Sequence, residues 1–279
     1  MLEQTSSVLR ITALIHAALA VPLALWFMVE APSIESHHAA WKPFKFALSI
    51  GLFLFTMAWL TPWLDVSPRV RTSIDWLLAT TMFIEMMAIG IQAIRGRSSH
   101  FNETTLLDAV LWKTMMAAIV ITSLTMLAVT LVATLRPLVD SNGSAMAPLL
   151  TLAWRGGLWL FLFVPISGFT MGGRLSRFVG GVSNQALPVV HWSTTQGDFR
   201  VSHFFALHAL QALLLLAVLL HELALPESTG RWVMFGAIGL GLLLIATTYV
   251  QAHLGRPFLR QATVPAATTP KGNSTGTSP

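Results

Sequence analysis

The chain contains no cysteine, which excludes disulfide bonds, thiolate metal sites, iron–sulfur clusters and covalently attached haem. Charge is also scarce: charged residues make up 10% of the 279 residues, hydrophobic residues make up 54%, and mean hydropathy is +0.67. A water-soluble domain needs far more charge to cover its surface. The basic residues form no stripe that could follow a nucleic-acid backbone, so the net charge of +5 does not indicate a nucleic-acid partner. The composition therefore indicates a membrane protein.

Seven apolar stretches, each close to a membrane thickness long, account for most of the sequence. Runs of this length are typical of helices, which satisfy their own backbone in lipid. We therefore expect residues 1–260 to form an all-α, polytopic bundle in the lipid bilayer, with spans at roughly 8–28, 44–63, 74–94, 112–135, 153–172, 203–224 and 231–252. The first span is longer than a signal-peptide core, so we expect it to be retained. Residues 261–279 are rich in Ala, Thr, Pro, Gly and Ser and are expected to be disordered.

An odd number of spans places the two ends of the chain on opposite faces, called here side A (N-terminal) and side B (C-terminal). Side B carries eleven of the 17 Lys and Arg residues, and side A carries six. The positive-inside rule then places side B in the cytoplasm.

A weak internal repeat has an offset of 159 residues. Gln-Ala-Ile-Arg-Gly-Arg (92–97) ends the third span, and Gln-Ala-His-Leu-Gly-Arg (251–256) ends the seventh. Phe-Ala-Leu occurs at 46–48 and again at 205–207, at the same offset. Two parallel three-helix repeats joined by the fourth helix would produce this pattern. The short matches leave that arrangement open.

Polar residues gather near side B, where seven of the nine histidines fall. Ionisable groups within a membrane usually mark functional sites. We therefore expect a polar, ligand-binding pocket that opens on side B. Its expected lining is Lys45, Glu85, Gln92, Arg95, His100, Asn102, Asp198, Arg200, His208 and Gln211.

Glu85 is the centre of this expected site because it lies near the middle of the third span. A carboxylate at that depth costs several kcal/mol unless it is protonated or paired, so we expect Glu85 to be neutral or paired with a base near side B. Gln92 lies on the same helical face, and His208 and Gln211 share a face of the sixth helix. We expect the sixth helix to pack against the third, so that these four groups satisfy one another.

Several of these residues have simpler interpretations. Thr105-x-x-Asp108 and Thr195-x-x-Asp198 both match a capping box ahead of an apolar run. Lys42, Lys45, Arg174 and Arg177 are typical of topology and headgroup anchors, which is the interpretation preferred for the two arginines. His37 and His38 are expected to be loop residues in water.

Histidine ligation of haem b or a metal ion is a further alternative. The candidate ligands are His100, His203, His208 and His253. Haem b would need two axial imidazoles on facing helices, and no spacing in the sequence demands that arrangement.

Three strings carry a resemblance to known proteins: residues 41–50 (WKPFKFALSI), 99–102 (SHFN) and 192–211 (WSTTQGDFRVSHFFALHALQ). They resemble a family of uncharacterised bacterial multi-pass membrane proteins. The resemblance implies a bacterial inner-membrane location and no particular activity.

The leading functional hypothesis is a ligand-binding or carrier-like bundle whose side B pocket holds a small polar or anionic molecule. Lys45, Arg95 and Arg200 would supply positive charge to it. A membrane enzyme or electron-transfer protein with haem or metal, and a membrane assembly factor with a polar docking face, remain open alternatives.

The charge asymmetry makes a testable prediction about orientation. Topology reporters fused after residue 145 and after residue 265 should report opposite compartments, with the second in the cytoplasm. An external signal from the C-terminal fusion would contradict the assignment of side B.

Overall fold

The computed structural model describes residues 5–29, 31–34, 37–181 and 185–260. Within these ranges, seven helical segments are long and apolar enough to cross a membrane. They are α1 (Ser7–Trp26), α2 (Trp41–Leu60, continued by the 3-10 turn η1, Thr61–Trp63), α3 (Pro68–Ile94), α4 (Leu106–Leu135), the pair α5 (Pro148–Phe161) and α6 (Phe163–Arg174), α7 (Arg200–Glu222) and α8 (Glu227–His253). The predicted all-α bundle of seven membrane helices is confirmed. The tail predicted for 261–279 lies outside the described residues.

Several helices begin earlier than predicted because their first turns contain charged residues, such as Arg69 in α3 and Asp108 in α4. α3 begins at Pro68, with Ser67 as its N-cap, and α4 begins at Leu106, with Thr105 as its N-cap. Proline suits the first turn because the missing N–H would have no helical partner there. An estimate from hydropathy alone places the start of a helix at its first long apolar run and so omits such turns.

The fifth span is two helices with a break at Leu162. Pro165 lies one turn beyond the break, and its ring nitrogen cannot donate to the carbonyl of Phe161. The break therefore has a local cause in the sequence.

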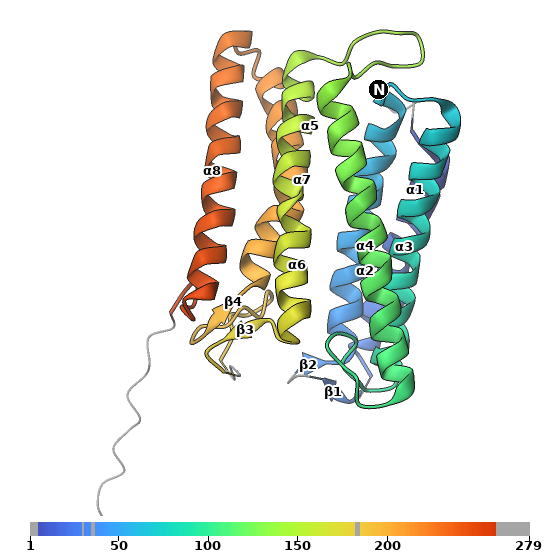
Figure 1. Ribbon diagram of the computed structural model, residues 1–279, viewed down its shortest axis with the longest axis vertical. Helices are drawn as coiled ribbons and strands as arrows, with labels where there is room; N and C mark the ends of the chain where they lie inside the picture. The colour runs from blue at the N-terminus through green and yellow to red at the C-terminus, as the bar shows by residue number, and fades with distance from the viewer. Residues whose placement is uncertain (1–4, 30, 35–36, 182–184, 261–279) are drawn as a thin grey trace, which may run out of the picture.

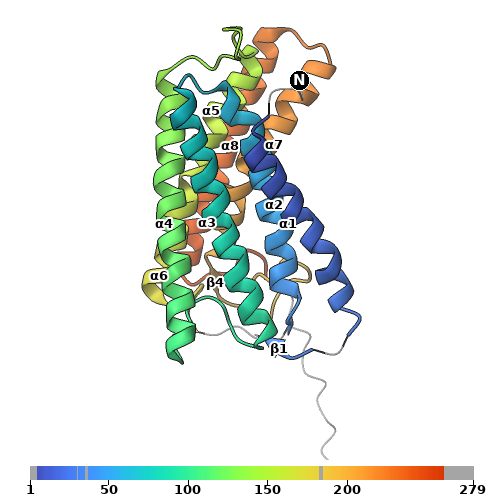
Figure 2. The same ribbon diagram turned by 90° about the vertical axis from the view of Figure 1, so that its right-hand side faces the viewer.

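Two short antiparallel hairpins cover the side B end of the bundle, opposite the N-terminus (Figures 1 and 2). β1 (Ser33–Ile34) pairs with β2 (His37–His38), and β3 (Phe178–Val179) pairs with β4 (Gly197–Asp198). Each hairpin directly precedes the second helix of a three-helix group.

The helices pack as two such groups. α1, α2 and α3 contact one another, as do α5, α7 and α8, with α6 packed on α7. α4 contacts both groups through α3 and α5 (Figure 1). The first three-helix unit is therefore α1–α3 with its hairpin, and the second is α5–α8 with its hairpin.

Helix boundaries in the two units coincide at the offset seen in the sequence. α2 and α7 begin at residues 41 and 200, α3 and α8 begin at 68 and 227, and α3 and α8 end at 94 and 253; each pair is 159 residues apart. The connection before α7 spans residues 175–199, and the one before α2 spans 27–40, which explains the shorter offset of the first helices. This agreement supports the duplication much more strongly than the short sequence matches.

The repeated Gln-Ala-x-x-Gly-Arg string forms the same helix end twice. In the first copy, the N–H of Arg97 donates to the carbonyl of Gln92 and that of Gly96 to Ala93. In the second copy, Arg256 donates to Gln251 and Gly255 to Ala252. Both glycines are left-handed, with φ of 66° and 69°. These are two Schellman caps, which need a glycine because a Cβ is disfavoured at this φ.

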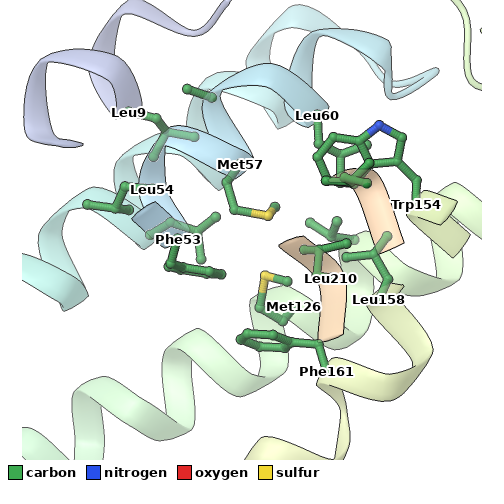
Figure 3. Packing of buried hydrophobic residues seen from close by; sticks show 14 of the residues in the cluster. Leu9, Phe53, Leu54, Met57, Leu60, Met126, Trp154, Leu158, Phe161 and Leu210 are labelled. Atoms are coloured by element: carbon green, nitrogen blue, oxygen red, sulfur yellow. The ribbon is translucent and has the colours of Figure 1, made fainter. Parts of the chain in front are cut away.

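One large apolar core joins the two units in the half of the bundle nearer side A. Side chains from α1, α2, α4, α5 and α7 pack together there (Figure 3). Phe53 of α2 and Phe161 of α5 stack across the junction, with ring centroids 5.4 Å apart. Nearer side B, the described residues form only two small apolar clusters, around Ile89 and around Phe199.

The expected packing of the sixth span against the third is wrong. α7 packs on α5, α6 and α8, whereas α3 packs on α1, α2 and α4. Gln211 lies near Thr56 of α2, at 3.5 Å, and His208 packs on the ring of Phe204 in its own helix. The arrangement in units provides the reason, because α7 packs within the second unit, whereas α3 packs within the first unit and on α4.

Because the two caps have the same geometry, the same substitution at each glycine should lower the free energy of unfolding by a similar amount. Gly96→Ala and Gly255→Ala should each destabilise the protein by about 1 kcal/mol, because alanine is strained at positive φ. Gly239→Ala in α8 is the control, since a Cβ there meets nothing within 4 Å. Thermal unfolding in detergent measures all three. A large cost at one cap and none at the other would contradict their equivalence.

Candidate ligand-binding site

Two adjoining cavities lie between the three-helix units on the side B half of the bundle. The outer cavity has a volume of about 210 Å³ and the inner cavity about 190 Å³. Both are lined by Phe46, His100, Phe101, Met171 and His203. These five shared residues form the neck between the cavities.

The outer cavity is strongly basic. Its lining includes five Lys and Arg side chains, five histidines and, within the described part of the chain, no Asp or Glu. The basic residues are Lys42, Lys45, Arg97, Arg177 and Arg200, and the histidines are His37, His38, His100, His191 and His203. Both units contribute to this set.

The inner cavity is mainly apolar. Phe53 and Phe161, which belong to the core, also line it, so the cavity begins where the core ends. Val164 and Pro165, next to the helix break, line its wall together with Gly168. Its ionisable lining residues are Glu85, His100 and His203. The inner cavity thus combines an apolar body with polar groups near the neck.

Two side-chain contacts connect the outer cavity to the inner one, through Lys42, His100 and Glu85. The Lys42 Nζ lies 3.1 Å from His100 Nδ1, and His100 Nε2 lies 3.5 Å from Glu85 Oε1. A protonated lysine amine can only donate, so Nδ1 accepts and the ring hydrogen sits on Nε2, facing the carboxyl group. Glu85 is thus paired with a base near side B, as expected. Its other oxygen, Oε2, is buried without a hydrogen-bond partner among the described residues.

Aromatic rings hold His100 in place. The rings of Phe46, Phe101 and Trp112 surround it, with centroids between 5.5 and 5.9 Å away. Burial, with the positive charge of Lys42 nearby, holds the pKa of His100 well below its usual range. His100 is therefore a neutral imidazole at neutral pH.

His203 is the corresponding neck residue of the second unit. Its Nδ1 lies 2.9 Å from the hydroxyl oxygen of Ser167 in α6. This contact fixes the orientation of the ring, which lines both cavities.

Asp108 anchors the α3–α4 connection behind the neck. It is fully buried and accepts hydrogen bonds from Gln92, Arg95, Arg97, Thr104 and Thr105 at 2.7–2.9 Å. Thr105 is also the N-cap of α4 and accepts the N–H of Asp108, so the threonine half of the predicted capping box is confirmed, whereas the Asp108 carboxylate accepts hydrogen bonds from side chains. The carboxylate additionally neutralises two arginines and thereby fixes the loop that carries His100.

Asp198, the last residue of β4, is the buried carboxylate that fixes the connection before α7 in the second unit. Its carboxylate binds the Arg200 guanidinium at 2.6–2.9 Å and accepts the N–H of Ser193. Thr195 is not an N-cap, because α7 begins only at Arg200 and Phe199 is its N-cap, but Asp198 does accept the N–H of Arg200, the first residue of α7. Asp198 fixes an arginine and a loop.

His191 joins the loops of the two units across the outer cavity. Its Nδ1 accepts a hydrogen bond from Trp41 Nε1 at 2.6 Å, and its ring stacks on His37 with centroids 3.7 Å apart. The carbonyl of His191 accepts a hydrogen bond from Arg200. Partial burial, together with the positive charges nearby, lowers the pKa of His191 to about 4.

The structure brings four of the ten expected site residues to the cavities: Lys45, Glu85, His100 and Arg200. Gln92, Arg95 and Asp198 instead belong to the supporting hydrogen-bond networks, and Asn102 bonds Ser98 and Thr104 within its own loop. His208 and Gln211 line neither cavity. Of the arginines at the two repeated caps, Arg97 lines the outer cavity and Arg256 does not.

Sequence reasoning missed three lining residues in particular. His37 was expected to be a loop residue in water. Lys42 was interpreted as a possible membrane anchor, and an anchor was the preferred interpretation of Arg177. All three line the outer cavity. Lys42 was detectable, because it lies one helical turn before Lys45. Arg177 carried no such signal, since only the long connection before α7 brings it to the cavity.

The four candidate metal ligands do not meet at one point. His100 and His203 line the cavities, whereas His208 lines neither and His253 is exposed at the end of α8, against Phe199 and Tyr249. The described residues contain no group of three or more His, Asp or Glu side chains placed to hold a metal ion.

Comparison of the chain with protein-family models, with curated proteins and with solved structures gave no match.

The low pKa of His191 predicts that the folded protein loses stability as the pH falls. The unfolded chain binds a proton at this residue near pH 6.5 and the folded protein only near pH 4, so stability should fall as the pH drops through that interval. His191→Asn cannot be protonated and should reduce the loss of Tm between pH 7 and pH 5. His221→Asn, at an exposed histidine near side A, is the control. Equal acid sensitivity in wild type and His191→Asn would contradict this role.

Proposed function

We propose that this integral membrane protein binds or carries a small anionic molecule, which it holds in the outer cavity between its two three-helix units. The observation that supports the proposal is the lining: five Lys and Arg side chains and five histidines, with no carboxylate from the described residues. A concave surface with one sign of charge and low-dielectric walls attracts ions of the opposite sign. Lys and Arg are also the usual partners of phosphate and carboxylate groups.

The supporting networks favour a preorganised site. Arg97 and Arg200 are held by Asp108 and Asp198, so their charge is partly compensated and their position is fixed. Lys42, Lys45 and Arg177 come from α2 and from the β3 side of the second unit. A ligand between them would contact both units, as in carriers whose sites lie between structural repeats.

We further propose a bacterial inner-membrane location with side B in the cytoplasm. The Lys and Arg asymmetry supports the orientation, and the resemblance of residues 41–50, 99–102 and 192–211 to bacterial multi-pass proteins supports the location. The ligand would then enter from the cytoplasm.

Two neighbouring arginines provide the test. Arg177 lines the outer cavity, and Arg174, three residues earlier, does not. Phosphate, titrated at constant ionic strength against chloride, should raise the Tm of the wild-type protein in detergent. Arg177→Gln should require roughly tenfold more phosphate for the same shift, because a charge-assisted hydrogen bond is lost.

Arg174→Gln removes the same charge three residues earlier, at the end of α6, and should titrate like the wild type. If phosphate stabilises the wild type no more than chloride does, or if both variants titrate alike, the proposed anion site is wrong.

A further inference from the structure

We propose that the ligand is an anionic amphiphile whose charged head lies in the outer cavity and whose apolar chain lies in the inner cavity. The proposal rests on the proposed function, since it takes the outer cavity as the site of the negative charge, and adds the chemical class of the ligand. The head of the ligand is a phosphate or carboxylate, and a hydroxyl group lies where the head joins the chain.

The first argument is the change in lining from the outer cavity to the adjoining inner cavity. The cavities share five lining residues at the neck, so a molecule in one cavity is adjacent to the other. Beyond the neck, the lining changes from basic side chains to Phe53, Phe161, Val164 and Leu207. A small hydrophilic anion would satisfy the outer half only, whereas a single-chain amphiphile matches both halves.

The second argument is Glu85 at the neck. Glu85 is 3% exposed and lines the inner cavity. Its Oε1 faces His100, while Oε2 is buried without a hydrogen-bond partner within the described ranges. A buried hydrogen-bonding atom without a partner costs free energy, so this oxygen favours a ligand that brings a hydroxyl group, which can both donate and accept, to the point where head and chain join.

The depth of the inner cavity gives the third argument. It reaches from His100 to the stacked rings of Phe53 and Phe161, where the core begins. Ser123 of α4 lines the inner cavity, and its hydroxyl group donates to the carbonyl of Ile119 in its own helix. A larger side chain at Ser123 would fill the space assigned to the chain without removing any charged group of the outer cavity.

Chain length is tested first, with the full-length protein in amphipol and calorimetric titration. Octyl phosphate should bind at least about 50-fold more tightly than methyl phosphate, because each methylene moved from water to an apolar site contributes about fourfold. Ser123→Phe should reduce this ratio about tenfold or more and leave methyl phosphate unaffected. Ser73→Phe is the matched control, since Ser73 is exposed on α3 and bonds its own helix in the same way.

The neck is tested with a pair of ligands that differ by one hydroxyl group. 1-O-octylglycerol 3-phosphate should bind about tenfold more tightly than its 2-deoxy counterpart. Glu85→Leu should abolish that preference, and Glu85→Gln, which keeps an acceptor oxygen, should retain part of it. If Glu85→Leu does not fold, the chain-length test with Ser123→Phe still decides the proposal.

The outcomes separate the two proposals. If methyl phosphate binds and depends on Arg177 while octyl phosphate binds no more tightly, the amphiphile is excluded and the anion site stands. If octyl phosphate binds but neither phosphate ligand depends on Arg177, the proposed anion site fails. Loss of the chain-length effect in Ser73→Phe as well as Ser123→Phe would overturn the assignment of the chain to the inner cavity.

Discussion

Every polar group below the membrane surface in this bundle needs a partner inside the protein, and that constraint decides how side B is built. Asp108 and Asp198 are buried carboxylates that can persist only because arginines and backbone or side-chain donors surround them. Both fix a connection at the side B end of a unit. Arg97 and Arg177 lie on those fixed connections and Arg200 pairs directly with Asp198, so three of the five Lys and Arg residues of the outer cavity depend on carboxylates that do not line it.

The duplicated architecture explains why the cavities lie where they do. Within each unit the helices pack closely, as at Gly157, where a Cβ would approach the backbone of Leu210 to 2.7 Å. Between the units, the apolar core fills the junction near side A and ends at Phe53 and Phe161. Beyond this point the fifth span is broken at Leu162, and Val164, Pro165 and Gly168 of α6 line the inner cavity. The space left between the units is the inner cavity. The outer cavity adjoins it toward side B, where the two hairpins lie.

The two units are similar in outline and different in chemistry. Their helix boundaries and Schellman caps coincide, yet the neck receives His100 from the α3–α4 connection of the first unit and His203 from α7 of the second. Glu85 has Leu244 at the equivalent position in α8, so only one unit supplies a carboxyl group. The lining of the two cavities therefore lacks twofold symmetry, although the helix boundaries of the two units coincide.

The sequence by itself determined the class of protein, the seven spans, the repeat offset and the crowding of polar residues near side B, because hydropathy, caps and charge are local properties of the chain. It also predicted four residues that line the cavities, Lys45, Glu85, His100 and Arg200. The tertiary structure alone decided which polar residues face a cavity and which support one another. Gln92 and Asp198 look like site residues in the sequence and prove to be partners of Asp108 and Arg200. Arg177 and His37 look like surface residues and line the outer cavity, because that role depends on how two units meet, which no local pattern records.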